Sequence, residues 1–198
     1  MATSITLCNV GKAYTVSKKN LLAIDNISFS VPAGGFFTIL GPSGCGKSTI
    51  INLIAGFISP NDGSVKVNDE TVTGPAPDRV IVSQEYGAFP WKTAHENVEF
   101  VLKASNIPKT ERKKTILKYL EMVGIKKFAN SYPFQLSSGM KRRLILARAL
   151  AVKPECLLMD EPLVGLDMQL RYAMQEDISR IWDEERPTVI WVTHDLEE

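Results

Sequence analysis

The sequence predicts an α/β domain in which a sheet of parallel strands is covered by helices. Short, continuous apolar runs alternate along the chain with longer segments in which apolar residues recur at the 3.6-residue period of a helix. The runs lack the alternation of a half-buried strand, as expected when both faces of a strand are covered. Of the 198 residues, 44% are hydrophobic and 23% are charged, which excludes a disordered, collagenous or coiled-coil chain.

Four apolar runs are predicted to be the buried strands of this sheet. They cover residues 36–40, 80–82, 156–159 and 189–192. Three further runs lie in the N-terminal third, at residues 5–9, 24–31 and 64–67. Their apolar stretches are short, which indicates antiparallel strands. The sequence therefore predicts an N-terminal antiparallel β subdomain beside the parallel core.

Helical patterns fill the middle of the chain. In residues 110–124, the apolar residues Ile116, Leu120 and Val123 lie on one helical face, and Gly124 is predicted to end the helix. A second amphipathic helix spans about 170–182 and ends before Pro187. Because residues 87–152 contain no convincing strand, they are predicted to form a helical subdomain inserted into the sheet domain.

Charge and cysteine content exclude several classes of protein. There are 23 basic and 22 acidic residues, a net charge of +1, so no overall field attracts nucleic acid and any anion site must be local. Three widely spaced cysteines suggest neither a disulfide framework nor a zinc site, and they fit a reducing compartment. The N-terminus has no basic and apolar leader pattern, and every long apolar stretch is interrupted by charge, so neither a secretion signal nor a membrane span is expected.

The most specific motif is a phosphate-binding loop, G-x-x-x-x-G-K-[ST], between a predicted strand and a predicted helix. In this motif glycines allow backbone N–H groups to surround a polyphosphate, and the start of the helix adds positive potential. Lys47 is expected to reach the β and γ phosphates, and the Ser48 hydroxyl to ligate Mg²⁺. The loop consists of Gly41, Pro42, Ser43, Gly44, Cys45, Gly46, Lys47, Ser48 and Thr49. Lys47 is expected to be exposed and to contribute to ligand binding without contributing to the core.

Polar residues follow several of the predicted strands. Asp160 and Glu161 end the third strand of the parallel sheet, where Asp160 is expected to hold Mg²⁺ partly through water and Glu161 to polarise an attacking water. His194 and Gln84 end two other strands. Taken alone, each is more often a solvated or capping residue, but the carboxyl ends of parallel strands form the ligand-binding edge of such sheets. We therefore expect these residues to converge.

A third motif, residues 136–143, precedes a helix that continues to about Leu150. It reads Leu-Ser-Ser-Gly-Met-Lys-Arg-Arg. Basic residues in the first turn of a helix oppose its dipole, so this helix start would gain from a bound anion.

Together these motifs resemble the nucleotide-binding subunit of ABC transporters over almost the whole chain. The resemblance implies a phosphate-loop NTPase fold with a RecA-like parallel core. The core and β subdomain would occupy residues 1–87 and 153–198, and the helical subdomain, with the signature motif, residues 88–152. It also implies an ATPase with ATP and Mg²⁺ as cofactors and a Q-loop at Gln84 that contributes to catalysis and the metal site. Tyr14 would stack on adenine, Asp167 would be the D-loop aspartate and His194 the switch histidine.

The resemblance also implies partners. Ser137 and Gly139 of one subunit would bind the γ phosphate of the other in a head-to-tail homodimer that holds two ATP molecules. This dimer would drive a membrane permease at the cytoplasmic face of the cell membrane, supplied by a substrate-binding protein and without nucleic acid. The strings at 74–79 and 86–91 are similar to those of the nitrate, sulfonate and taurine importers, which implies import of a small anion.

Three departures from the family pattern lead to further expectations. Ser138 replaces a usual glycine and is expected to strain the signature loop if its backbone needs positive φ or must approach phosphate closely. Arg142 replaces a usual glutamine, and residues 164–165 differ from the usual small pair. The chain ends just after His194, as if truncated, so weak hydrolysis is expected. Two alternatives stay open at this point: an ATP-binding interaction module with weak hydrolysis, and a non-transport ABC ATPase.

Overall fold

A computed structural model describes residues 2–16, 19–83 and 87–196. Contacts divide the chain into two compact units. The first unit comprises Met1–Ile81, Glu155–Pro162 and Arg186–Glu198, and the second comprises Val82–Pro154 and Leu163–Glu185. Each unit is described by itself.

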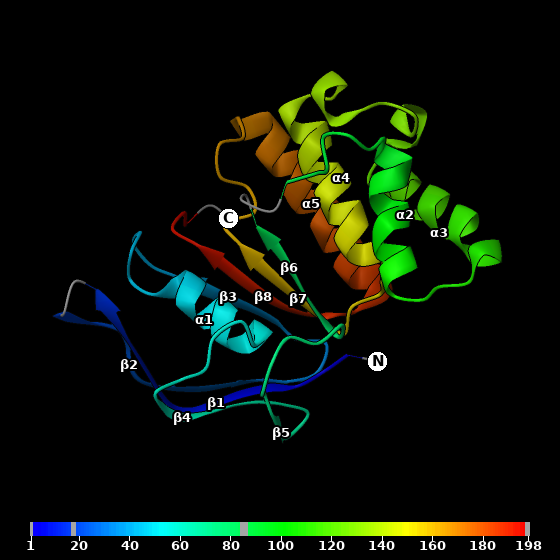
Figure 1. Cartoon of the computed structure of the whole chain (residues 1–198). Coiled ribbons are helices and arrows are strands. Elements are labelled where there is room, and N and C mark those ends of the chain that lie inside the picture. The colour runs from blue at the N-terminus through cyan, green and yellow to red at the C-terminus, as the bar shows by residue number, and fades with distance from the viewer. Residues whose placement is uncertain (1, 17–18, 84–86, 197–198) are drawn as a thin grey trace. The chain divides into compact units, whose positions relative to one another are not determined.

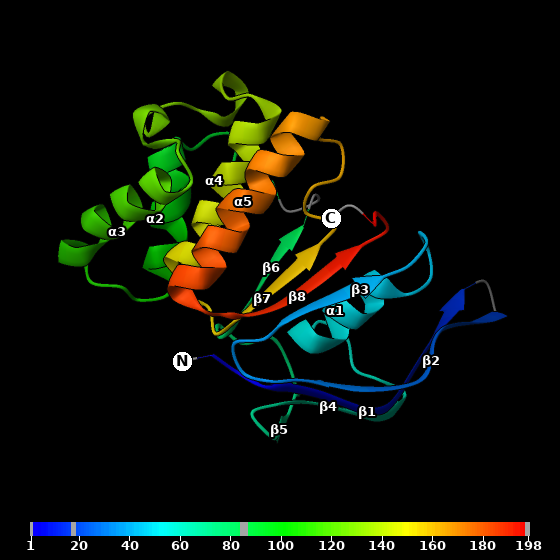
Figure 2. The ribbon, with the colours of Figure 1, turned by 180° about the vertical axis from the view of Figure 1, so that it is seen from behind.

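The first unit contains both sheets, apart from the last two residues of β6, and a helix between them (Figures 1 and 2). Four strands form an antiparallel sheet in the order β2-β1-β4-β5. The other sheet has the order β3-β8-β7-β6, and β8 pairs in parallel with both β3 and β7. The antiparallel strands are β1 (Ile5–Val16), β2 (Lys19–Val31), β4 (Asp62–Val67) and β5 (Glu70–Thr71); the others are β3 (Phe36–Leu40), β6 (Arg79–Ser83), β7 (Cys156–Asp160) and β8 (Thr188–Thr193). The α/β fold class and its antiparallel subdomain are thus confirmed.

Helix α1 (Lys47–Ala55) packs against both sheets and joins their cores. Its residues Ile51, Leu53 and Ile54 are almost completely buried, in one cluster with apolar residues of β1, β7 and β8. Because apolar area is removed from water on both sides of the helix, α1 fixes the position of the loop that precedes it. That loop is the phosphate-binding motif.

The prediction of full burial is correct for β7 and β8 but wrong for β3. Every residue of β8 is buried, whereas β3 alternates, with Phe36, Thr38 and Leu40 exposed. The reason is position, since β3 is the last strand in its sheet order within the described part of the chain. A continuous apolar run does not distinguish an edge strand from a central one.

The second unit is helical. Helices α2 (Ala94–Ala104), α3 (Lys109–Met122) and α4 (Ser138–Ala151) pack against one another, and α5 (Met168–Glu185) belongs to the same unit. Two short 3₁₀ helices, η1 (Lys126–Phe128) and η2 (Pro133–Gln135), connect α3 to α4. Sequence analysis grouped residues 168–185 with the core instead, and that domain division stays a prediction.

Local chemistry explains where the helices begin and end. Thr93 and Glu96 form a reciprocal capping box at the start of α2, and the hydrogen bonds from Thr93 lower the pKa of Glu96. Helix α3 ends at Met122 with Val123 as its C-cap, followed by Gly124 with φ of +74°, a conformation that favours glycine. The predicted stop at Gly124 therefore lies within two residues of the observed end.

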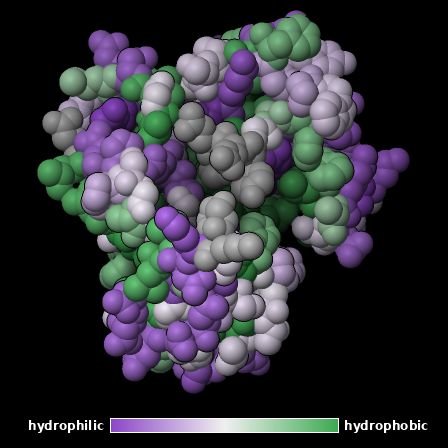
Figure 3. Space-filling view, turned by 60° about the vertical axis from the view of Figure 1, so that its left-hand side comes forward, coloured by the Kyte–Doolittle hydropathy of each residue, from purple (hydrophilic) through white to green (hydrophobic). Residues whose placement is uncertain are grey.

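The surface drawn in Figure 3 mixes hydrophilic and hydrophobic residues in small groups. Across the part of the chain that the structure describes, none of the helices combines the length and apolar character needed to span a bilayer.

Candidate functional site

The phosphate-binding loop joins β3 to α1 in the first unit and depends on two glycines with positive φ. Gly44 has φ of +82°, and Gly46, which precedes the first residue of α1, has φ of +99°. A Cβ atom on Gly46 would lie 2.4 Å from the carbonyl oxygen of Ala23. Only glycine can adopt positive φ freely and also leave room for this carbonyl oxygen, so the glycine of the motif at this position has a direct structural reason.

Lys47 lies beneath this loop. Its side chain is only 5% exposed, and its Nζ donates hydrogen bonds to the carbonyl oxygens of Gly41 (2.7 Å) and Pro42 (2.9 Å). The same Nζ lies 3.7 Å from Oε1 of Glu161. The expectation of an exposed lysine is therefore wrong, because the loop wraps around the ammonium group and supplies it with acceptors.

The second loop residue with a predicted ligand role is Ser48. Its Oγ donates a 3.1 Å hydrogen bond to Oδ1 of Asp160, at the end of β7. A hydroxyl and a carboxylate at this separation are the hard oxygen ligands that suit Mg²⁺. Among the described residues no cluster of three or more His, Cys, Asp or Glu side chains is present, so one carboxylate and one hydroxyl would leave most positions to phosphate and water.

Glu161 has an unusual backbone conformation for a residue that is not glycine. It has φ of +47°, and its N–H donates to the carbonyl of Val192 on β8 (2.9 Å). A non-glycine residue in this region costs about 1–2 kcal/mol, which the surrounding structure must offset. Such strain tends to occur where a side chain has a required position, and here it directs the carboxylate toward Lys47.

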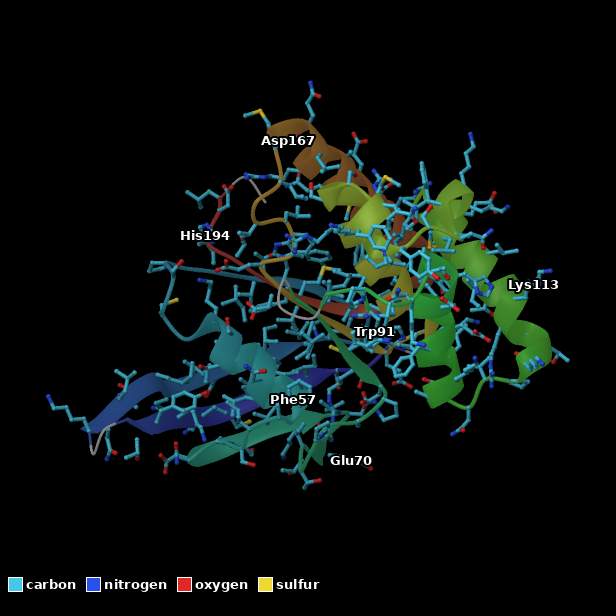
Figure 4. The ribbon with its side chains drawn as sticks, turned by 45° about the horizontal axis from the view of Figure 1, so that its top comes forward. Phe57, Glu70, Trp91, Lys113, Asp167 and His194 are labelled. Carbon is cyan, nitrogen blue, oxygen red and sulfur yellow. The ribbon has the colours of Figure 1, made fainter. Side chains whose placement is uncertain are left out.

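The carboxylate of Glu161 also meets His194, which lies just beyond β8 and is labelled in Figure 4. Oε1 of Glu161 is 3.2 Å from Nδ1 of His194. The Glu161 side chain is 28% exposed, so water can still reach it. The edge of the parallel sheet thus gathers a cation, two carboxylates, a hydroxyl and an imidazole in one unit.

Tyr14 lies on β1 in the same unit. Its OH is 3.5 Å from Oγ1 of Thr49, at the limit of a hydrogen bond, and Nζ of Lys12 lies 5.6 Å from the centre of its ring. Lys12 is held in place by a hydrogen bond to the carbonyl of Ser59 (2.7 Å). A half-buried aromatic ring anchored to the first turn of α1 is suited to stack on a planar ligand beside the loop.

Gln84, predicted to contribute to catalysis and to the metal site, lies outside the described residues. The two signature residues, Ser137 and Gly139, lie in the second unit and are described there.

The signature motif begins α4. Ser137 is its N-cap, with Oγ accepting a hydrogen bond from the N–H of Met140 (3.2 Å). Ser138 is the first residue of the helix and is absent from the residues with positive φ, so the expectation of strain through positive φ is wrong, whereas strain through close approach to phosphate stays a prediction. A helical backbone accepts serine as readily as it accepts most residues in its first turn.

Gly139 lies where the structure leaves no room for a side chain. A Cβ atom on this buried glycine would lie 2.5 Å from Cδ2 of Leu170 on α5. The small residue therefore allows α4 and α5 to approach closely. Sequence reasoning assigned Gly139 only to phosphate binding and missed this packing role.

Two departures from the family pattern contact each other. Arg142 of α4 donates a 2.6 Å hydrogen bond from its guanidinium to the carbonyl oxygen of Val164, and Gly165 follows with φ of +77°. Asp167 then accepts a hydrogen bond from the N–H of Leu170 through Oδ1 (2.9 Å) and so caps α5. The segment before α5 is thus fixed from both ends, which sequence spacing alone did not reveal.

Comparison with known proteins decides the family. The family model described as ABC transporter matches residues 24–164, a span that includes the phosphate loop, the signature motif and the carboxylates at the end of β7. The chain is an ABC transporter ATP-binding domain. It is accordingly an ATPase of the ABC type, and two solved ABC cassettes that resemble it are dimers.

Several ABC transporter ATP-binding proteins resemble this domain, some of them named for a transported substrate. An uncharacterised ABC transporter ATP-binding protein of Methanocaldococcus jannaschii is 41% identical over all of this chain and 74% of its own length. The bicarbonate transport ATP-binding protein CmpD of Synechocystis is 43% identical over 98% of this chain and 70% of its own. The nitrate import ATP-binding protein NrtD of Synechococcus elongatus is 40% identical over 96% of this chain and 70% of its own length.

Among solved structures, an ATP-binding cassette dimer in a post-hydrolysis state with ADP and Pi superposes with a TM-score of 0.85 at 32% identity. The match covers 98% of this chain and 89% of that one. The ABC domain therefore shares its fold with a cassette that binds nucleotide as a dimer.

Proposed function

We propose that this ABC domain is the ATPase subunit that powers import of a small anion, such as nitrate, bicarbonate or a sulfonate, through a membrane permease. The observation that carries the ATPase part is the cluster at the sheet edge, where Lys47 and His194 both lie within 4 Å of Oε1 of Glu161. The anion part is supported by the names of relatives that are 40% and 43% identical, one for nitrate and one for bicarbonate. The domain would lie at the cytoplasmic face of the membrane, beside its permease.

In this proposal the loop N–H groups and Lys47 bind the β and γ phosphates of ATP. Lys47 would exchange its carbonyl acceptors, Gly41 and Pro42, for phosphate oxygens, a stronger pairing because both partners are charged. Ser48 and Asp160 would hold Mg²⁺, which when bound neutralises charge on the phosphates. Tyr14 would stack on the adenine ring.

Glu161 is proposed as the general base that orients and deprotonates the attacking water. Its carboxylate has one oxygen, Oε1, near Lys47 and His194, and its partial exposure leaves room for water. His194 would hold the carboxylate in position through Nδ1 and contact the γ phosphate on its other side. Gln84 would join this set from outside the described residues.

A head-to-tail dimer would complete the site. Ser137 and Gly139 of the second subunit would bind the γ phosphate, since both lie at the start of α4, where N–H groups lack helical acceptors. The dimeric state of two similar cassettes supports this arrangement. A substrate-binding protein would deliver the anion to the permease on the opposite face of the membrane.

The ATPase assignment is tested by Glu161→Gln, which removes the base while keeping the side-chain size. We expect ATP affinity to persist and turnover to fall about 10²- to 10⁴-fold. Glu70→Gln, at an exposed position on β5, is the matched control and should keep full turnover. Turnover in Glu161→Gln equal to that of the parent would remove Glu161 from the role of base.

The substrate assignment is tested in proteoliposomes that contain this domain, the permease encoded beside its gene and the binding protein. Nitrate, bicarbonate and taurine are added in turn, and ATP hydrolysis is measured with each. We expect at least one of these three compounds to stimulate hydrolysis. Stimulation by a sugar or a cation alone would overturn the anion assignment and leave the ATPase assignment intact. Absence of any permease that binds the domain would favour a non-transport ABC ATPase.

A further inference from the structure

Positive charge is concentrated in one short segment of the helical unit. Residues 103–118 contain six basic residues and one acidic residue, a local charge of 6 − 1 = +5 in a chain whose net charge is +1. The rest of the chain therefore carries 1 − 5 = −4. We call this segment the basic segment; its basic residues are Lys103, Lys109, Arg112, Lys113, Lys114 and Lys118.

The structure places most of this charge on the first two turns of α3. Lys109, Lys113 and Lys114 are exposed, and none of the three forms an ion pair with a carboxylate among the residues that the structure describes. Lys113 lies on the outer side of α3 (Figure 4). Lys118 pairs with Glu185 of α5 and Lys103 pairs with Glu99 of α2, so these two charges are already neutralised.

This arrangement is unfavourable for the helix itself. Lys109 and Lys113 are four residues apart and repel each other, and the first turn carries two basic residues, Lys109 and Arg112, against one acidic residue, Glu111, so its net charge opposes the helix dipole. Pro108 at the N-cap position supplies no side-chain hydrogen bond to offset that cost. Helix α3 is held instead by burial of Ile116, Tyr119 and Leu120. Burial of the Tyr119 hydroxyl also raises its pKa. The exposed lysines of the basic segment therefore do not hold the helix, and their charge is available to a negatively charged partner.

We propose that the basic segment binds the anionic phospholipid headgroups of the membrane surface beside the permease. This inference rests on the proposed permease-coupled function, which brings the domain to a membrane. Clusters of lysine and arginine beside a membrane are attracted to anionic lipid, and each residue near the surface changes partitioning by about fivefold. Nucleic acid is the less favourable polyanion, because residues 103–118 include no aromatic side chain on which bases could stack.

The test is sedimentation of the purified chain with vesicles. One set contains phosphatidylcholine alone, and the other contains phosphatidylcholine with about one third phosphatidylglycerol. The chain is expected to sediment with the anionic vesicles and to be released as NaCl rises, because salt screens exposed charges. The variant Lys109→Gln, Lys113→Gln, Lys114→Gln is expected to bind about 100-fold more weakly, the product of three fivefold effects.

A control variant removes the same charge elsewhere: Lys19→Gln, Lys66→Gln, Lys153→Gln. It should retain most of the affinity for anionic vesicles. Equal losses in the two variants would overturn the proposal, because net charge would then explain the binding. Equal binding of the parent to both vesicle sets would overturn it as well, and so would binding to a single-stranded RNA homopolymer that exceeds binding to anionic vesicles.

ATP turnover is measured on the same samples. The basic segment lies outside the proposed catalytic residues, so the triple variant should hydrolyse ATP at the parental rate, which also verifies folding. Loss of vesicle binding with normal turnover supports the lipid surface. An inactive parent that still binds anionic vesicles would refute the proposed function without refuting this surface.

Discussion

Replacement of Lys47 tests both the burial of this side chain and its ligand role. Its ammonium group donates to the carbonyls of Gly41 and Pro42 and lies 3.7 Å from Glu161. Lys47→Ala removes these contacts together with a buried aliphatic chain. Sequence reasoning, which treated Lys47 as exposed, instead predicts no effect on folding.

The magnitude follows from the surroundings of the ammonium group. A hydrogen bond to a charged group contributes about 1.5–3 kcal/mol. Pro42 is exposed, so water replaces Lys47 there, and the bond to Gly41 contributes most of the loss. We expect Lys47→Ala to lower the free energy of unfolding by about 1–3 kcal/mol. Each kcal/mol lost should lower Tm by about 2–4 °C in a chain of this size.

The assay combines denaturant unfolding without nucleotide and titration with a fluorescent ATP analogue. Lys47→Met separates the two contributions, because it keeps the buried chain and removes only the charge. Lys19→Ala, at an exposed position of β2, is the control and should change stability by less than about 0.5 kcal/mol. Parental stability of Lys47→Ala would show that the observed contacts do not stabilise the fold, and parental ATP affinity would refute the ligand role.

Four further outcomes are expected. Gly139→Ala should destabilise the domain by about 1–3 kcal/mol in denaturant unfolding, since its Cβ would lie 2.5 Å from Leu170; unchanged unfolding would mean that α5 shifts freely. Ser138→Gly should leave ATP turnover within about twofold of the parent, because there is no positive φ to relieve, and a large gain would restore the strain hypothesis. Trp91→Ala should weaken permease binding in a pull-down while leaving Tm unchanged, because the side chain is 70% exposed; a lower Tm with normal binding would assign it to packing. Burial raises the pKa of the Cys156 thiol to about 12 from an ordinary 9.0, so iodoacetamide at pH 8 should spare it, and stability should fall as pH rises above about 9, where the unfolded thiol ionises first.

Local patterns in the chain were sufficient for the strands of the parallel sheet, for helices α3 and α5 and for the phosphate loop, but they missed β5. The motif spacing specifies a loop in which Gly44 and Gly46 adopt positive φ, and continuous apolar runs identify β7 and β8. These features depend on neighbours in sequence, which is why periodicity and motif spacing predict them.

Contacts between distant residues were decided only by the tertiary structure. Glu161 and His194 meet because two parallel strands end at the same edge, although the distance of 3.2 Å and the positive φ of Glu161 cannot be derived from spacing. The hydrogen bond from Arg142 to Val164 joins residues 22 positions apart and depends on how α4 packs near the start of α5. The exposure of β3 and the burial of Lys47 likewise depend on which elements lie beside them, because burial is a property of packing and residue type alone does not determine it.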